Sequence, residues 1–208
     1  MRQQYMTPFY FSGDENMNTT LAAAAVVDKT SSYPGLFEKA GVVDLTLVAQ
    51  DSSDHGYTAS PQPLWKSRTK ANCIYIQGTD NYDGLRRIIA APDGTSLYIV
   101  APYTAETTAT GDTVFPGLSF DEPWFFRGYR LHLDTASATE ENLTINLDAD
   151  RGSAWDYNII TEPMNTVKDI IDIFDEPIWV PAKDIVKAAW ANTDDRTWGL
   201  ELLMTMEV

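Results

Sequence analysis

The chain is poor in the residues that build covalent cross-links and metal centres. Its 208 residues include one cysteine, Cys73, so neither an intrachain disulfide nor a cysteine metal cage can form. Its two histidines, His55 and His132, are not spaced as a metal pair on one element. We therefore expect no metal site and no cofactor, and a fold held by packing and by oligomerisation.

Basic residues and long apolar runs are also scarce. The chain has 15 Lys and Arg against 30 Asp and Glu, a net charge of −15. Such a chain is repelled by phosphate backbones and anionic lipids, so we expect no nucleic-acid and no membrane partner. The longest apolar run, residues 21–27, is well short of the roughly 18–20 residues that span a bilayer. It follows acidic Asp14 and Glu15, which predicts that no secretory signal is present.

Catalytic motifs are missing as well. There is neither a Gly-x-Ser-x-Gly elbow nor a phosphate-cradling glycine loop. Paired carboxylates can hydrolyse glycosides, which leaves a depolymerase as an alternative, but in strands and turns such groups are usually solvated or cap backbone amides. Residues 148–152 slightly resemble a calcium turn without its remaining ligands. We therefore predict no catalytic residue and no enzyme. The candidate carboxylate clusters are Asp148/Asp150, Asp169/Asp172/Asp175/Glu176 and Asp194/Asp195.

What the chain does contain is apolar surface in β-type patterns. Hydrophobic residues make up 44% and aromatic residues 12%, enough to offset the entropy of ordering. We predict a mainly β protein in three regions. Residues 1–40 are expected to form an irregular N-terminal arm, either packed on a neighbouring subunit or flexible, with a short helix or strand at residues 20–27.

Residues 41–116 are expected to form a small β module. Residues 43–48 alternate apolar and polar, which is typical of a half-buried strand, and residues 73–77 form a second apolar run. Residues 51–63 read as a long loop. Two Asp-Gly turns about ten residues apart, at Asp83-Gly84 and Asp93-Gly94, favour a meander or small barrel.

Residues 117–208 are predicted to form an antiparallel, jelly-roll-like β-sandwich. Residues 129–133 and 143–147 alternate with a period of two. Residues 168–173 fit a strand or one helical turn, and we favour a strand over a helix at 182–190. Pro177 and Pro181 confine residues 176–180 to an edge strand. Residues 199–206 close the sheet.

Two polar or aromatic segments stand out in this region. In the run Trp124, Phe125, Phe126 and Tyr129, alternate strand residues face opposite sides, so at least one should leave the core to meet a neighbouring subunit or domain. The segment 192–199 is expected to be a tight turn whose Asn and Asp side chains cap backbone amides, while Gly199 relieves crowding. His132 alternates with two leucines and should be solvated.

Several segments carry a family likeness. Residues 74–84, with Gly-Thr-x-Asn-Tyr-Asp-Gly, followed by residues 87–99, resemble a small β module common in tailed-phage virion proteins. The C-terminal part resembles phage-particle β-sandwich proteins through Arg-Leu-His-Leu at 130–133, Glu-Asn-Leu-Thr-Ile-Asn-Leu-Asp at 141–148, Gly-Ser-x-x-Asp-Tyr at 152–157 and Asn-Thr-Asp-x-Arg-Thr-Trp-Gly-Leu-Glu at 192–201.

This resemblance implies a virion structural protein. It favours a capsid decoration (cement) protein on the outside of the shell, bridging subunits of the major capsid protein or other virion proteins and forming a homotrimer. The alternatives are a tail- or fibre-associated receptor- or glycan-binding protein, or a head–tail adaptor. No functional residues of the family carry over, because such proteins act through surfaces.

Overall fold

The protein is mainly β, as the sequence predicts. The computed structural model describes residues 6–13, 16–17, 19–21, 28–29, 44–50, 73–93, 96–101, 104, 106–107, 109 and 111–206. Within these ranges the chain forms strands and one short 3₁₀ helix, η2 (Ser153–Trp155). The described residues contain no helix that is long and apolar enough to cross a bilayer. His55 and the loop expected at 51–63 lie outside the described residues.

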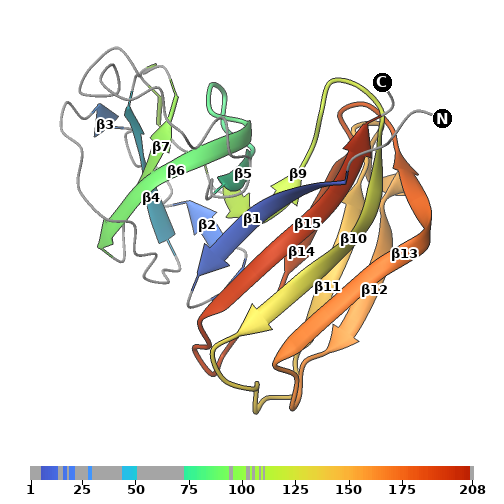
Figure 1. Ribbon diagram of the computed structural model, residues 1–208. Helices are drawn as coiled ribbons and strands as arrows, with labels where there is room; N and C mark the ends of the chain where they lie inside the picture. Colours follow the sequence, from blue (N-terminus) through green and yellow to red (C-terminus); the bar gives the residue numbers. More distant parts are fainter. Residues whose placement is uncertain are drawn as a thin grey trace.

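Two four-stranded antiparallel sheets pack face to face as a β-sandwich (Figure 1). In the first sheet the order is β1 (Thr7–Gly13), β15 (Trp198–Met206), β10 (Trp124–Leu133) and β13 (Asp169–Val180). In the second it is β12 (Tyr157–Pro163), β11 (Asn142–Asp148), β14 (Ile185–Ala189) and β9 (Gly117–Leu118).

The sandwich core comes from the period-two pattern of the strands. Along β10, Leu131 and Leu133 are buried while Arg130 and His132 are exposed, and β11 alternates in the same way. One continuous core joins the two sheets. Its largest fully buried side chains include Trp124, Trp190, Trp198, Tyr129 and Phe126. Burial of this much apolar and aromatic area is the main stabilising term for such a fold.

A β-bulge at Gly128 interrupts β10. The pairings of β10 with both β13 and β15 shift register between Phe126 and Gly128. Gly128 has φ of +129°, and a Cβ there would lie 2.1 Å from the carbonyl oxygen of Asp172. Glycine is therefore required at this position, and the bulge keeps both Phe126 and Tyr129 on the core side.

Strand β13 confirms the predicted edge strand but is longer than expected. Its two predicted pieces form one strand of 12 residues, without the alternative helical turn. Within the segment 182–190, residues 185–189 are likewise a strand, β14. Pro177 fits because β13 lies at the edge of the first sheet, where its missing N–H costs no ladder bond.

Part of the region expected as an irregular arm is instead sheet. β1, β2 (Thr19–Leu21) and β3 (Asp28–Lys29) all fall within residues 1–40. β1 pairs with the last strand, β15, over its whole length, and Phe11 enters the sandwich core. A local pattern cannot reveal this strand, since its partner lies at the other end of the chain.

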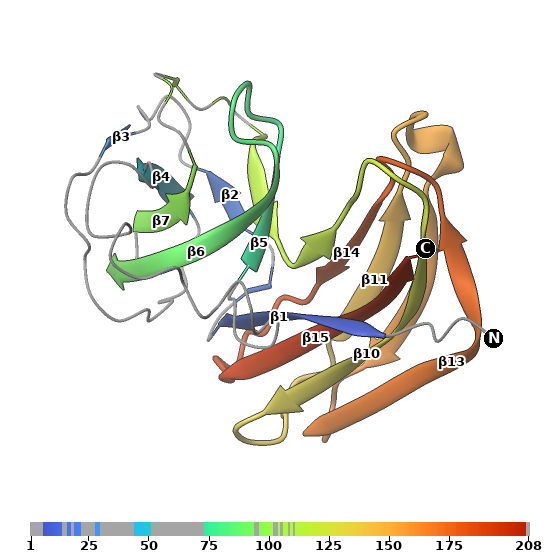
Figure 2. The ribbon, with the colours of Figure 1, turned by 45° about the horizontal axis from the view of Figure 1, so that its top comes forward.

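The remaining strands close into a ring beside the sandwich (Figure 2). Its pairing order is β2, β8 (Thr113–Phe115), β5 (Cys73–Gln77), β6 (Gly84–Asp93), β7 (Ser96–Val100) and β4 (Asp44–Gln50), and β4 pairs back to β2, with β3 also on β4. Closure pairs both sides of the strands that form the ring, while β3, which pairs only with β4, lies at the end of the sheet order. The chain passes from β8 in the ring to β9 in the sandwich at Pro116.

A small contact joins the ring to the sandwich. Tyr75 and Phe115 belong to the ring of strands, and their aromatic side chains stack with centroids 5.3 Å apart. Both pack with Ile185 of β14. The Lys187 ammonium lies 5.2 Å from the centroid of Phe115 and 2.5 Å from a carboxylate oxygen of Asp148. Apolar packing, the contact of Lys187 with Phe115 and a hydrogen bond from Gln77 to Asp148 thus hold the two units together.

Candidate functional site

The candidate carboxylates lie at separate places in the fold, and they form ion pairs and hydrogen bonds with neighbouring structural residues. Asp148 pairs with Lys187 and accepts a 3.4 Å hydrogen bond from Gln77 of the ring. Asp169 on β13 contacts Nδ1 of exposed His132 at 2.6 Å. Among the described residues, no three His, Cys, Asp or Glu side chains are grouped as a metal site would require.

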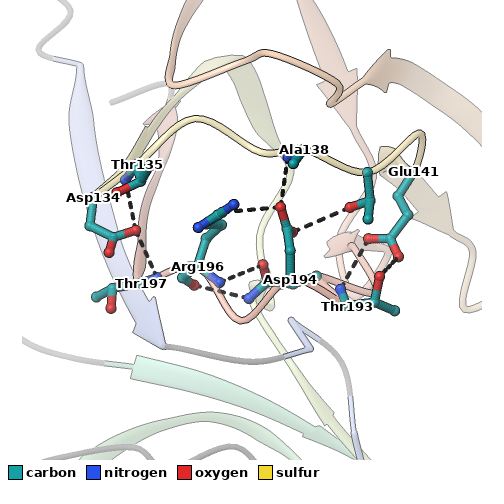
Figure 3. Close-up of polar contacts among 10 residues, drawn as sticks. Asp134, Thr135, Ala138, Glu141, Thr193, Asp194, Arg196 and Thr197 are labelled. Carbon is teal, nitrogen blue, oxygen red and sulfur yellow. Dashed lines mark hydrogen bonds and ion pairs between the residues drawn. The ribbon is translucent and has the colours of Figure 1, made fainter.

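The third carboxylate cluster, around Asp194, joins two loops at one end of the sandwich (Figure 3). Asp194 accepts a 2.7 Å hydrogen bond from the Ala138 N–H and pairs with Nε of Arg196 at 3.0 Å. Burial raises the pKa of Asp194, but the Ala138 hydrogen bond and the Arg196 charge outweigh it, so its pKa lies below the usual value. Glu141 accepts hydrogen bonds from the backbone N–H and the hydroxyl of Thr193.

The predicted turn at 192–199 is confirmed, with one correction. Asn192 accepts a 3.0 Å hydrogen bond from the Arg196 N–H and donates one of 2.9 Å to its carbonyl. Asn192 and Asp195 both have φ near +50°, which Asn and Asp tolerate better than most residues. The role predicted for Gly199 is wrong: nothing lies within 4 Å of a Cβ built there. We call this pair of loops, residues 134–141 and 192–197, the clasp, and its contacts are structural.

The aromatic run after Pro123 divides between the two faces of its sheet, as the strand period predicts. Trp124, Phe126 and Tyr129 are fully buried in the core. Phe125 points the other way and lies opposite Trp179 in the β10–β13 register. Burial raises the pKa of the Tyr129 hydroxyl, so that group stays protonated.

The face of the first sheet that points away from the core carries several exposed apolar side chains; we call it the outer face. On β13, Ile170 and Phe174 pack on the core, whereas Ile171 and Ile173 between them are 72% and 43% exposed. Trp179, farther along the same strand, is 56% exposed. Large apolar groups gathered on one face are typical of a protein-docking surface.

Some charged and polar groups of the outer face contact one another. Arg130 contacts Glu201 at 3.1 Å, and His132 contacts Asp169. These groups line a shallow hollow of about 470 Å³, together with Tyr10 and Ile171. In the hollow, burial and then the charge of Glu201 raise the pKa of Tyr10, which keeps its hydroxyl protonated. Paired charges reduce the cost of covering this face with another protein.

Two exposed tryptophans were missed in the sequence. Trp155, in η2 between β11 and β12, is 59% exposed, and Trp179 is exposed on the outer face. A signal was present for Trp155, because it lies with Tyr157 in the otherwise largely polar stretch 148–158. The sequence does not predict the exposure of Trp179, because its neighbours Ile178 and Val180 are also apolar. Its orientation depends on the register with β10.

Comparisons of the chain with protein-family models, with curated proteins and with solved structures yielded no match.

Proposed function

We propose that this protein is a structural component of a tailed-phage particle, and that it acts as a decoration protein that docks on the shell through its outer face. The observation that carries the proposal is the exposed apolar side chains of β13, Ile171, Ile173 and Trp179. The paired charges beside them lower the cost of desolvation.

The segments with virion likeness support the same proposal by their placement. The turn at 78–84 is ordered by Asp83, which accepts 2.8 Å hydrogen bonds from the N–H and hydroxyl of Thr79, and by Glu106, which caps Asp80. The other segments form parts of β6 and β7, β10, β11, η2, β15 and the clasp at 192–197. Most of their residues build the scaffold, while Arg130, His132 and Glu201 contribute to the outer face that we propose contacts neighbouring virion proteins.

The direct test is reconstitution of particles stripped of this protein. Wild-type protein should restore periodic density over the shell in electron micrographs and raise the temperature at which particles release DNA. The Ile171→Glu and Trp179→Ala variants should bind at least about tenfold more weakly, because truncating an aromatic or apolar anchor commonly costs that much.

The matched control is Trp155→Ala, which removes an exposed tryptophan outside the outer face. It should bind the shell like the wild type. Equal shell binding by the outer-face variants would exclude this face as the docking surface. Density confined to the tail or neck would replace the decoration role with a fibre or adaptor role, and stripped particles that retain DNA equally well would exclude a cement role.

A further inference from the structure

A separate feature lies at the tip of the β11–β12 connection, away from the outer face. Trp155 is 59% and Tyr157 46% exposed, and the guanidinium of Arg151 lies 5.1 Å from the centroid of the Trp155 ring. Figure 2 shows η2 projecting beyond the ends of β11 and β12. We call this feature the aromatic tip and define it by Arg151, Trp155 and Tyr157.

The aromatic tip is held in place although it is exposed. Nη2 of Arg151 lies 3.5 Å from Oδ2 of Asp184, whose side chain is 1% exposed. The other oxygen of Asp184 accepts a 3.2 Å hydrogen bond from the Asp150 N–H. Asp156 accepts a 2.8 Å hydrogen bond from the Ala149 N–H, which closes the connection. The Trp155 ring therefore lies against a guanidinium that a buried carboxylate anchors, so less ordering entropy is lost when a ligand binds.

The surroundings of Trp155 favour a sugar over a protein partner. Residues 150–158 are all exposed, and most of the side chains around the tryptophan are polar: Asp150, Arg151, Ser153, Asp156 and Asn158. A protein anchor lies at the centre of a large patch of roughly 800 Å² on each partner, whereas this apolar area is a single ring with a tyrosine nearby. One flat ring bordered by hydrogen-bonding groups suits the apolar face of a pyranose and its hydroxyls.

The charge around the tip narrows the class of sugar. Asp156 follows Trp155 directly and Asp150 precedes it by five residues in the same exposed stretch, Arg151 contacts Asp184, and the chain carries a net charge of −15. Acidic sugars are therefore repelled. We propose that the aromatic tip binds neutral carbohydrate, with Trp155 as the stacking platform and Arg151 and Asp184 as positioning residues. This site is independent of docking through the outer face.

The test is binding of the full-length protein to an array of neutral and anionic oligosaccharides, followed by calorimetric titration with the neutral oligosaccharide retained most strongly. Wild-type protein should bind neutral members and not the anionic ones. Trp155→Ala should weaken binding at least about tenfold, and Trp155→Phe should weaken it less because an aromatic face remains. Trp179→Ala, a control of similar exposure on the outer face, should bind as the wild type does.

The positioning role has its own readout. Arg151→Ala should weaken binding to the same oligosaccharide and change the near-ultraviolet circular dichroism of Trp155, isolated as the difference from Trp155→Ala. Arg151→Lys retains the charge beside Asp184 and should restore part of the affinity. Unchanged melting temperatures in these variants would separate the effect from unfolding, since the altered side chains are more than half exposed.

Two results would overturn the proposal. They are no binding of wild-type protein to any neutral oligosaccharide at about 1 mM, or equal binding by Trp155→Ala. If the wild type bound no sugar and Trp155→Ala also lost shell binding, the tip would be a protein contact, which differs from failure of the outer face, reported by Trp179→Ala.

Discussion

At the scale of single residues, Gly128 sets the register of two strand pairs. We expect Gly128→Ala to lower the free energy of unfolding by about 3 kcal/mol, because its φ of +129° is unfavourable for alanine and the new Cβ would meet the backbone of Asp172 and Ile173. Denaturant unfolding of the variant measures the change.

The matched control for this prediction is Gly199→Ala on neighbouring β15. Nothing lies within 4 Å of a Cβ at that position, so the variant should differ from wild type by less than about 0.5 kcal/mol. Similar losses in both variants would mean that any added methyl group in this sheet is destabilising, whatever the backbone conformation at the bulge.

Asp194 makes the stability of the clasp depend on pH. Its folded-state pKa lies below the ordinary value of 3.8, so the ionised form stabilises the fold at neutral pH, and this contribution is lost as pH falls below that value. We expect Asp194→Asn to cost about 1–2 kcal/mol at pH 7, from weakened bonds to Ala138 and Arg196, and progressively less below pH 3.8.

Thermal unfolding of both proteins between pH 2 and 7 would measure this difference. Asp195→Asn is the control, since Asp195 is exposed and asparagine tolerates its φ of +52°. A gap between wild type and Asp194→Asn that stays constant down to the lowest pH would contradict the ionic origin of the effect.

At the scale of elements, β13 carries packing on one face and a candidate interface on the other. Phe174 contacts Phe126 edge to face, with centroids 5.4 Å apart, whereas Ile171 is exposed. We therefore expect Phe174→Ala to lower the free energy of unfolding by about 2 kcal/mol and Ile171→Ala to change it by less than about 0.5 kcal/mol. Urea unfolding tests both, and equal losses would show that Ile171 also packs within the monomer.

Alternation explains which elements the sequence predicts well. The sequence predicts β11 (143–147) and β15 (199–206) to within one residue of their observed bounds, whereas β10 begins at Trp124, five residues before the predicted segment 129–133. β13 is predicted in two pieces, residues 168–173 and 176–180, because Pro177 and Pro181 mark the second piece as a short edge strand, although one continuous edge strand accommodates Pro177. β1 is not predicted as a strand because its pairing partner, β15, lies about 190 residues away in the sequence, and a local pattern cannot show such a pairing.

The candidate surfaces were predictable to a similar extent. The outward direction of Phe125 follows from the strand period alone. The exposure of Trp179 requires the register of β13 on β10, and the contact between Arg151 and buried Asp184 requires the approach of β14 to the β11–β12 connection. Contacts of this kind depend on tertiary pairing, which the sequence pattern does not specify.

At the scale of the whole molecule, the ring is inserted between two strands of the sandwich. β1 precedes the ring strands and β9 follows them, so the sandwich contains segments from both ends of the chain. A fragment of residues 111–206 would lack β1 and Met17. Phe11 of β1 and Met17 are both buried in the core. We expect this fragment to lack a cooperative melting transition.

Adding a peptide of residues 6–17 should restore that transition, because it supplies the partner of β15 and the hydrogen bond from the Met17 N–H to the Trp190 carbonyl. The same peptide with Phe11→Ala should be much less effective. Calorimetry would follow both mixtures. A fragment that melts cooperatively without the peptide would show that β1 is dispensable.

The pairing of β1 with β15 also fixes how the protein responds to mechanical load. Thr7 lies opposite Met204, so the start of β1 and the end of β15 are adjacent, and tension between residues 6 and 206 would unzip the pair one hydrogen bond at a time. Tension between residues 6 and 195 would shear all the bonds together. In single-molecule pulling we expect a lower rupture force for the first attachment, and equal forces would contradict this. A load that enters through the chain ends would therefore open the sandwich at its β1 edge, where the bonds break singly.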